Sequence, residues 1–216
     1  MQNDQTVDKT ITILSIGDKS SNKIKLLNTF IEGKYNNEIP HFVFETTIKR
    51  YDYKGKKYGL VLSDMSEMDE FAAMRETTYK CCDVVLLCFN IGDKESYHNI
   101  YRKYYPDFYQ HQPTIPIFLV GNRSEKRNKN SDSCVSQNEG KQLQEMIKAQ
   151  SYVECSYKEN SNINDIFEQI IELFIQKEQK EIERVAYEKS GKMWFVGLCI
   201  LSVLCFIISL YSQLNN

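Results

Sequence analysis

The last 24 residues of the chain, 193–216, contain no charged side chain, although charged residues make up 26% of the whole sequence. Within this stretch, 16 of the 19 residues at 193–211 are apolar. As a helix, this run would extend about 28 Å, close to the roughly 30 Å thickness of a bilayer's hydrocarbon core. Trp194 and Tyr211 lie at its two ends, where aromatic rings favour the membrane interface. The run therefore predicts a single C-terminal transmembrane helix that anchors the protein in a lipid bilayer.

The residues on either side of this run predict its orientation. Lys189 and Lys192 precede it, whereas the short tail at 212–216 is uncharged, so the upstream domain should lie in the cytosol. A buried core helix, the alternative reading, would need a shell of protein on every face of the run. Residues 177–192 contain five basic and four acidic side chains, which predicts a charged helical stalk between the domain and the anchor.

The overall composition limits the class of protein. The chain has 27 basic and 29 acidic residues, and this balance argues against nucleic acid as a partner, because such binders carry a strongly basic face. The length before the anchor fits one domain. None of the seven cysteines forms a C-x-x-C pair and the three histidines are scattered, so neither a zinc site nor a disulfide framework is indicated.

Short apolar runs alternate with helical patterns after a polar segment, residues 1–8, that we expect to be disordered. The expected strands are 11–16, 43–53, 56–63, 83–90, 115–121 and 152–155. The expected helices are one that follows the first strand and runs through about Glu32, then 94–111, 137–149 and one from 163 onward. Lys54-Gly55 supplies a tight turn, so the second and third strands should form a hairpin. This order predicts an α/β fold with a mostly parallel six-stranded sheet and helices on both faces.

One segment within the expected helix 94–111 is rich in aromatic residues. It contains Tyr101, Tyr104, Tyr105, Phe108 and Tyr109. These rings could form an exposed interaction surface, but their spacing also suits a helix that packs on the sheet, and we favour packing. In folds of this class, ligands bind at the carboxyl ends of the strands, so the segments that follow the strands are the most informative about function.

The segment after the first strand partly matches a phosphate-binding loop, G-x-x-x-x-G-K-[ST]. It consists of Gly17, Asp18, Lys19, Ser20, Ser21, Asn22, Lys23 and Ile24. Gly17 permits the tight turn, and Lys23 is spaced to reach the β- and γ-phosphates of a nucleotide. Asn22 replaces the second glycine, and Ile24 replaces the hydroxyl residue that ligates Mg²⁺. Taken alone, this half-motif fits a plain strand-to-helix turn equally well.

Further segments follow in a fixed order, and with them the chain resembles the Ras superfamily of small GTPases, with Rho-like features. The matching segments are 40–45 for the first switch, 64–68 for Asp-x-x-Gly-Gln, 71–79 for the second switch helix, 104–106 (Tyr-Tyr-Pro, a Rho-like feature), 119–125 for the Asn/Thr-Lys-x-Asp region and 154–158 for the Ser-Ala-Lys/Leu loop. The resemblance covers residues 9–176 and implies a P-loop NTPase G domain. The additional helix of typical Rho proteins has little room within residues 126–136.

The resemblance implies that residues 17–24 hold the phosphates of GTP or GDP and that Asp64 lies near any Mg²⁺. It places Tyr35 against the guanine ring, Arg123 over the ring, Asn122 and Glu125 on the purine edge, and Ser156, Tyr157 and Lys158 along the base pocket. Glu125 and Arg123 keep the charges of the residues that they replace but change the reach of the side chains. Residues 38–47 and 64–79 would present the switch surfaces to protein effectors.

The catalytic positions implied by the resemblance are altered. Glu67 replaces the switch glycine, Met68 replaces the glutamine that orients water, and His41 or Phe42 stands where a threonine would bind Mg²⁺. Since phosphoryl transfer depends on positioning, hydrolysis by this chain alone should be very slow or absent. A catalytic role for His41 is less favoured than an exposed position. The sequence also fits a nucleotide-free pseudo-GTPase scaffold, or a GTPase whose catalytic group comes from a partner.

Overall fold

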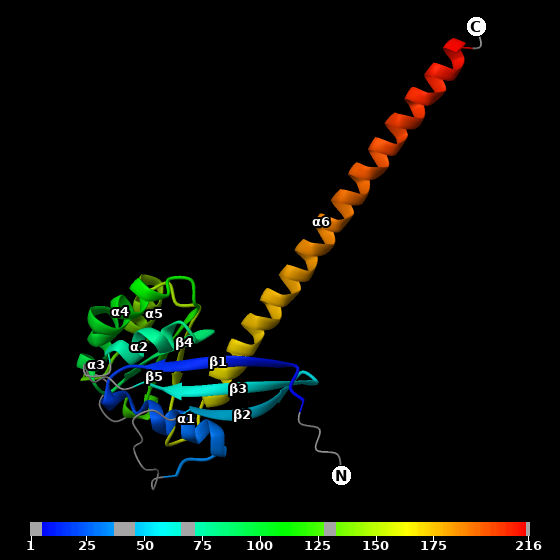
Figure 1. Ribbon diagram of the computed structural model, residues 1–216. Helices are drawn as coiled ribbons and strands as arrows, with labels where there is room; N and C mark the ends of the chain where they lie inside the picture. Colours follow the sequence, from blue (N-terminus) through cyan, green and yellow to red (C-terminus); the bar gives the residue numbers. More distant parts are fainter. Residues whose placement is uncertain (1–5, 37–45, 66–71, 128–132, 215–216) are drawn as a thin grey trace, which may run out of the picture. The chain divides into compact units, whose positions relative to one another are not determined.

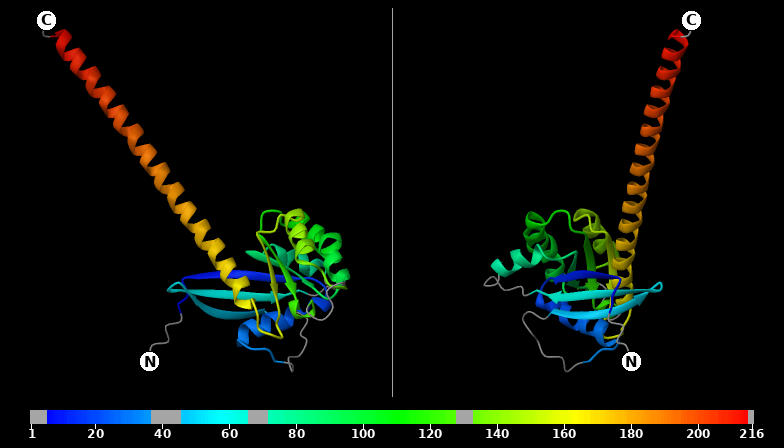
Figure 2. Two further views of the ribbon diagram at one scale, coloured as in Figure 1. Left: turned by 180° about the vertical axis from the view of Figure 1, so that it is seen from behind. Right: turned by 45° about the vertical axis from the view of Figure 1, so that its right-hand side comes forward.

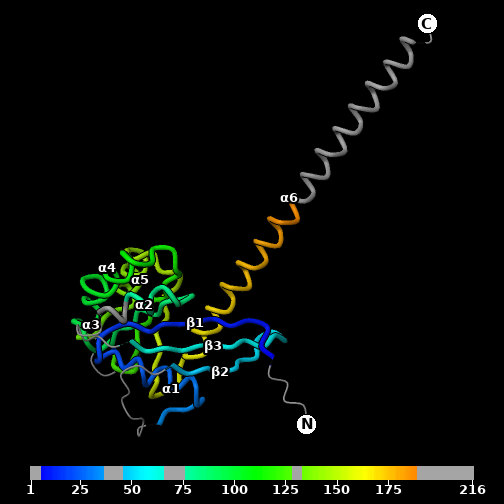
Figure 3. The backbone as a smooth tube through the Cα atoms, in the orientation of Figure 1, coloured from blue at the N-terminus to red at the C-terminus, as the bar shows by residue number. Residues whose placement is uncertain are grey.

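The computed structural model describes the chain except for residues 1–5, 37–45, 66–71, 128–132 and 215–216, and it describes no side chains at 72–75 and 189–216. Figure 3 draws in colour the backbone of the residues whose side chains are also described. Residues 1–169 form one unit and residues 170–216 a second, so each is treated by itself. The expected disorder of residues 1–8 falls mostly outside the described residues. Asp8, which is described, exchanges two hydrogen bonds with Lys57.

Six strands form one sheet in the order β2-β3-β1-β4-β5-β6 (Figure 1). They are β1 Lys9–Ile16, β2 Thr46–Tyr53, β3 Lys56–Asp64, β4 Val84–Asn90, β5 Ile117–Asn122 and β6 Ser151–Cys155. The β2–β3 hairpin turns at Lys54 and Gly55, which both have positive φ, and it supplies the one antiparallel pair in this sheet. The other pairs are parallel. The sequence prediction of a mostly parallel six-stranded sheet is confirmed.

Helices flank the sheet on both sides, with α1 on one side and α2, α4 and α5 on the other (Figures 1 and 2). The α-helices are α1 Lys23–Glu32, α2 Ala72–Tyr79, α3 Lys94–Asn99, α4 Tyr105–His111, α5 Gln137–Met146 and α6 Ile163–Leu214. Short 3-10 turns, η1 Lys19–Ser21 and η4 Ser124–Lys126, follow β1 and β5. All seven residues of β4 and all six of β5 are buried, as expected of strands that are covered on both faces.

Residues 94–111 form the helical segment that the sequence predicted, with a change of helix type within it. A π-helical stretch, η3 Ile100–Tyr104, joins α3 to α4. Pro106 lies in the first turn of α4 and has no N–H to donate to the preceding turn, so the regular α-helical hydrogen bond is missing at this point. Tyr104 and Phe108 are buried in the core, whereas Tyr109 is 45% exposed. The favoured interpretation, a helix that packs on the sheet, therefore holds for the inner side of this segment.

The first turns of α6 belong to the same unit as the sheet. The ring of Phe167 stacks on that of Phe30 from α1 with the centroids 3.5 Å apart. Tyr51 of β2 donates a hydrogen bond to Glu168 at 2.7 Å. Lys49 donates to the carbonyl oxygens of Phe30 and Ile31 at the end of α1, which satisfies two acceptors that a helix end leaves open. These contacts position α1, and with it the loop that precedes α1.

The second unit, residues 170–216, consists of the remainder of α6 and its last residues. Ile182 and Tyr187 of the charged segment 177–192 are exposed. Within the part of the chain whose side chains are described, no helix is long and apolar enough to cross a membrane. The apolar run at 193–211 lies within the bounds of α6, but its side chains are outside that part.

Candidate functional site

The candidate site lies where the parallel strands end. β1 ends at Ile16, β3 at Asp64, β4 at Asn90, β5 at Asn122 and β6 at Cys155. In open sheets of this kind, the carboxyl ends of the strands form the edge at which ligands bind. The loops that the sequence singled out begin at these same positions, and the structure brings most of them into contact.

The loop between β1 and α1 requires unusual backbone conformations at two positions. Gly17 has a φ of +146°, and a Cβ atom there would lie 2.0 Å from the carbonyl oxygen of Cys88, so this position needs glycine. Asn22 adopts the left-handed conformation with φ 55° and ψ 41°, which asparagine tolerates better than most residues. Its side chain donates to the carbonyl oxygen of Ser20 at 2.7 Å. Asn22 thus supports the turn that a second glycine would otherwise make.

Lys23 is the first residue of α1, and its side chain points back under the loop. It is 4% exposed, and its ammonium group donates to the carbonyl oxygen of Gly17 at 2.5 Å. The same group lies 3.9 Å from Asp64 Oδ1. The hydroxyl of Ser15 also donates to Asp64 Oδ1, at 2.6 Å. A cation, a helix N-terminus and a turn of backbone amides thus meet here, which is an arrangement that suits a phosphate group.

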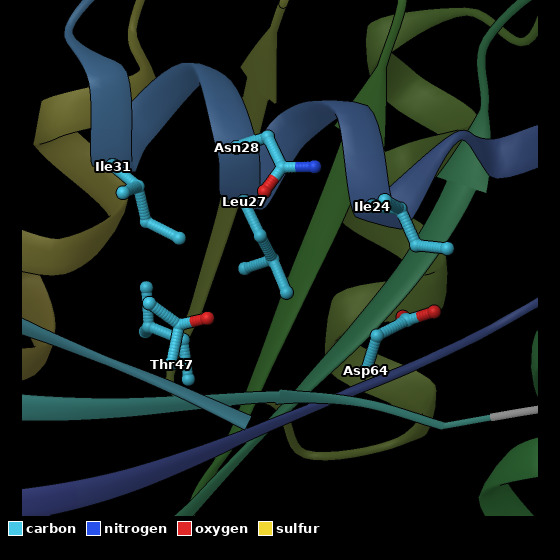
Figure 4. Close-up of a pocket in the computed structure, with 7 residues that line it drawn as sticks. Ile24, Leu27, Asn28, Ile31, Thr47 and Asp64 are labelled. Atoms are coloured by element: carbon cyan, nitrogen blue, oxygen red, sulfur yellow. The ribbon is translucent and has the colours of Figure 1, made fainter. Parts of the chain in front are cut away.

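Ile24 and Asp64 line one small pocket between α1 and the β2–β3 strands (Figure 4). Ile24 carries no oxygen, so among the described lining residues Asp64 alone offers a carboxylate to a cation. Magnesium in proteins is held by one or two carboxylates together with phosphate oxygens and water. In the described part of the chain, no group of three or more acidic, histidine or cysteine residues could hold a metal ion. Asp64 fits the role of a single Mg²⁺ ligand, and Ile24 does not.

Two acidic side chains, one in the loop and one at the start of α3, accept the hydrogen bonds that join the loop to the helical segment after β4. Asp18 accepts hydrogen bonds from Tyr104 and from Asn99, which come from η3 and α3. The hydroxyl of Ser20 donates to Asp93 at 2.6 Å, and Asp93 also caps the N-terminus of α3. The loop is therefore fixed at both of these positions by side chains from one neighbouring segment.

Sequence reasoning did not assign Ser15, Asn90 or Asp93 to the site. Asn90 ends β4, and its amide donates to the carbonyl oxygen of Ser20 at 2.9 Å. The signal that could have identified Asn90 and Asp93 was available, because both lie at the carboxyl end of a fully apolar strand run. Ser15 points from within β1 toward Asp64, and a strand-end rule does not find such a residue.

Asn122 joins the loop at residues 17–24, called the phosphate-type loop from here on, to the segment after β5. Its side chain is fully buried, and its amide nitrogen donates to the carbonyl oxygen of Ser21 at 2.8 Å. The amide oxygen accepts from the backbone N–H of Arg123 at 2.9 Å. With the amide oriented in this way, the carbonyl oxygen of Ser21 and the N–H of Arg123 both have a hydrogen-bond partner. Asn122 thus positions the loop in addition to the purine-edge role that the resemblance implies.

Glu125 is held by two other residues of the expected base pocket, Arg123 and Ser156. Arg123 Nε lies 2.9 Å from Glu125 Oε1, and the hydroxyl of Ser156 donates to Oε2 at 2.6 Å. Burial alone would raise the pKa of Glu125, but the hydrogen bonds from Ser156 and Arg123 outweigh it and keep the pKa below its ordinary value. The group is an ionised acceptor at neutral pH, and each of its oxygens keeps a further lone pair.

The remaining residues of the expected base pocket also come together, with one exception. Tyr35 and Tyr157 lie with ring centroids 5.2 Å apart, and the guanidinium carbon of Arg123 is 5.7 Å from the centroid of the Tyr157 ring. Tyr157 is buried, whereas Lys158 is exposed. Lys19 in the phosphate-type loop is exposed as well.

Several predicted positions lie outside the described residues. These are Glu67 and Met68 at the altered catalytic positions, His41 and Phe42, and most of the first switch segment. Of the two expected effector surfaces, the structure describes residues 46–47 of the first, and residues 64–65 and 76–79 of the second together with the backbone of 72–75. Residues 128–132, within the segment 126–136 that leaves little room for the additional Rho helix, are also outside the described residues.

A glycine-dependent loop between the first strand and helix, with a lysine beneath it and an asparagine from β5 bonded to it, defines a P-loop nucleotide-binding fold. Comparison of the sequence with known protein families narrows this class of proteins. The sequence profile of the Ras family matches residues 12–176, so this chain belongs to the Ras family. It is 27% identical over 163 residues to the Ras-like GTP-binding protein RhoL of Drosophila melanogaster. The matched region covers 76% of this chain and 86% of that protein.

Proposed function

We propose that this chain is a Rho-like small GTP-binding protein that binds guanine nucleotide and presents switch surfaces to effectors at a membrane. The observation that carries the proposal is the hydrogen bond from Asn122 to the backbone of Ser21. It couples the phosphate-type loop to the segment that bears Arg123 and Glu125, so the segments that would hold the phosphates and the base are connected. The similarity to RhoL and the Tyr-Tyr-Pro segment at 104–106 support the Rho-like assignment.

Guanine is the base that best fits the charge of this site. The carboxylate of Glu125 can accept hydrogen bonds from N1–H and N2–H of guanine, and adenine presents no such pair of donors. Ser156 and Arg123 hold this carboxylate in an ionised state. We therefore expect GTP and GDP to bind more tightly than ATP.

Slow or absent hydrolysis is the second part of the proposal. Ile24 cannot ligate Mg²⁺, and Met68 cannot orient a water molecule through a hydrogen bond. With Asp64 as a single carboxylate ligand, nucleotide binding should depend little on Mg²⁺. Such a protein would remain in one nucleotide state for long periods and act as a signalling or trafficking module through residues 38–47 and 64–79.

Membrane anchoring through residues 193–211, with the G domain in the cytosol, is the third part. It rests on the uncharged apolar run and on Lys189 and Lys192 before it. In cells, the full chain should stay in the membrane pellet after alkaline carbonate extraction, and a chain ending at 192 should not. Leu201→Arg, which places a charge in the middle of the run, should release the protein. Release of the unaltered full chain by carbonate would overturn this part.

Nucleotide titration tests the binding proposal. The full chain in detergent or nanodiscs should be titrated with fluorescent GTP, GDP and ATP, with Mg²⁺ and with EDTA. We expect guanine nucleotides to bind more tightly than ATP, with less than about a tenfold effect of EDTA, since one protein ligand to the metal is replaced by isoleucine. The absence of binding for all three nucleotides up to millimolar concentration would overturn the proposal.

A second candidate function, a nucleotide-free scaffold of the pseudo-GTPase type, is favoured by one observation. The ring of Tyr157 is buried against Tyr35 and Arg123, the residues expected on a guanine ring. Heat release followed by chromatography of the purified full chain discriminates between the two functions. Stoichiometric GDP or GTP in the supernatant would exclude the scaffold, and a nucleotide-free protein that still binds partners would support it.

A further inference from the structure

Tyr157 fills space in the base half of the candidate site. It follows β6 and Ser156 in the loop where the resembled family has alanine, so this chain adds a phenol ring at this position. The side chain is 2% exposed, so the ring is packed inside the protein. The loop that carries it is closed by a pair of backbone hydrogen bonds between Ser156 and Ser161, each at 3.1 Å.

The neighbours of this ring come from two other parts of the site. Tyr35, just after α1, lies 5.2 Å away between centroids at an interplanar angle of 53°. Arg123, after β5, places its guanidinium carbon 5.7 Å from the centroid, and Lys25 of α1 places its ammonium nitrogen at 5.9 Å. Both cations are within the range of about 6 Å at which they are attracted to an aromatic ring.

These contacts are the ones that a bound guanine would make. Tyr35 and Arg123 are the residues that the resemblance places against and over the base, and both already contact the ring of Tyr157. A phenol and a purine are both flat π systems that stack on an aromatic ring and attract a guanidinium group.

We propose that the ring of Tyr157 occupies the base position and competes, within the molecule, with the guanine of GDP or GTP. The proposal rests on the proposed nucleotide-binding function and identifies the residue that sets its affinity. Nucleotide binds only when Tyr157 leaves its contacts with Tyr35 and Arg123. The ring contacts of Tyr157 that carry the proposal come from Tyr35, Arg123 and Lys25, outside the phosphate-type loop at 17–24, so the competition concerns the base alone.

The test compares full chains in nanodiscs by calorimetric titration with GDP, GTP and inorganic triphosphate, which has phosphates but no base. Tyr157→Ala should raise the affinity for GDP and GTP by about tenfold or more, because binding no longer has to displace an aromatic ring. The affinity for triphosphate should change by less than about twofold, because the phosphate loop is untouched. Tyr157→Phe keeps the ring and should behave as the original chain.

The outcomes separate this inference from the function on which it rests. If the original chain and Tyr157→Ala bind GDP and GTP equally, the inference is wrong and the nucleotide-binding function stands. If neither binds any nucleotide, removing the ring has not opened a base site, and both proposals are wrong. An equal gain for triphosphate would also overturn the inference, because the effect would not depend on the base.

Folding of the variants is controlled separately. Circular dichroism and thermal unfolding identify a Tyr157→Ala protein that has lost its structure, and Tyr157→Leu then serves as a second variant that fills the core but cannot stack as a flat ring. It should likewise bind GDP more tightly than Tyr157→Phe does. Equal GDP affinities of the Leu and Phe variants would count against competition by an aromatic ring.

Discussion

The side-chain amide of Asn122 donates a hydrogen bond to the carbonyl oxygen of Ser21 at 2.8 Å, between residues that are 101 positions apart in the sequence. Asn122 is the last residue of β5 and Ser21 ends the 3-10 turn before α1. The bond joins the loop suited to phosphate with the segment suited to a base. Both groups are enclosed, so removing either one leaves a buried polar atom without its partner.

Asn122→Ala is expected to lower stability and weaken nucleotide binding together. The lost amide leaves the carbonyl oxygen of Ser21 and the backbone N–H of Arg123 without these partners, at a cost of about 1–3 kcal/mol in the free energy of unfolding. Urea unfolding followed by circular dichroism measures this change. Asn138→Ala, at an exposed position in α5, makes the same substitution without the buried bonds and should cost less than about 0.5 kcal/mol.

Ile24→Thr should make nucleotide binding depend on Mg²⁺. Ile24 and Asp64 line one pocket, so a hydroxyl at position 24 would add an oxygen beside the existing carboxylate (Figure 4). In fluorescence titrations of GDP, EDTA should weaken binding to Ile24→Thr by about tenfold or more, and it should affect the original chain less. Ile24→Val, which alters the volume but adds no oxygen, is the matched control. Equal EDTA effects for the Thr and Val variants would contradict this prediction.

The fold could be predicted from periodicity because the apolar pattern is strong where burial is complete. The run 83–90 is apolar because β4 is covered on both faces, and Lys54-Gly55 indicated the hairpin. The helix 94–111 was predicted, but the π-helical stretch within it was not, because the pattern of apolar residues continues through it. Pro106 was the available signal, since a proline within a helix removes a hydrogen bond to the preceding turn.

The sequence predicted those residues of the candidate site that belong to recognisable motifs, and it did not predict the others. Gly17 and Lys23 were identified by the spacing of a phosphate-binding loop, and Asn122 and Glu125 by the resemblance to the Ras superfamily. The structure brings these residues to one edge of the sheet. The bonds from Ser20 to Asp93 and from Ser15 to Asp64 depend on the register of the strands and on side-chain direction, which no local pattern encodes. The packing of Tyr157 against Tyr35 likewise joins segments that are distant in sequence.

The described cysteines should differ sharply in reactivity. Cys81 is exposed, whereas Cys88 and Cys155 are fully buried. Burial raises the pKa of Cys88 to about 12 and raises that of Cys155 well above its ordinary value, so neither forms the reactive thiolate near neutral pH. Brief treatment of the native chain with iodoacetamide at pH 8, followed by peptide mass spectrometry, should find Cys81 modified first. Modification of Cys88 at the same rate as Cys81 would contradict the burial, and unfolding in urea should remove the difference.

The ion pair between Arg127 and Glu154 should give the protein a stability that is lost in acid. Arg127 binds both carboxylate oxygens of Glu154, at 2.5 and 2.7 Å, and Tyr152 donates to one of them at 2.6 Å. Burial alone would raise the pKa of Glu154, but the bonds from Arg127 and Tyr152 outweigh it and lower the pKa. Because the folded pKa lies below the unfolded value of about 4.3, this stabilisation is complete above that value and is lost as the pH falls through the folded pKa.

Glu154→Gln tests this dependence. At pH 7 it removes one partner of an enclosed ion pair and should lower the free energy of unfolding by about 1–3 kcal/mol. As the pH falls below the unfolded value of about 4.3, the original chain loses part of the same interaction, so the two proteins should unfold at closer urea concentrations at pH 3 than at pH 7. Glu145→Gln, at an exposed position in α5, removes the same charge without the pair and should track the original chain at both pH values. A difference between Glu154→Gln and the original chain that stays constant from pH 7 to pH 3 would show that the pair does not titrate in this way.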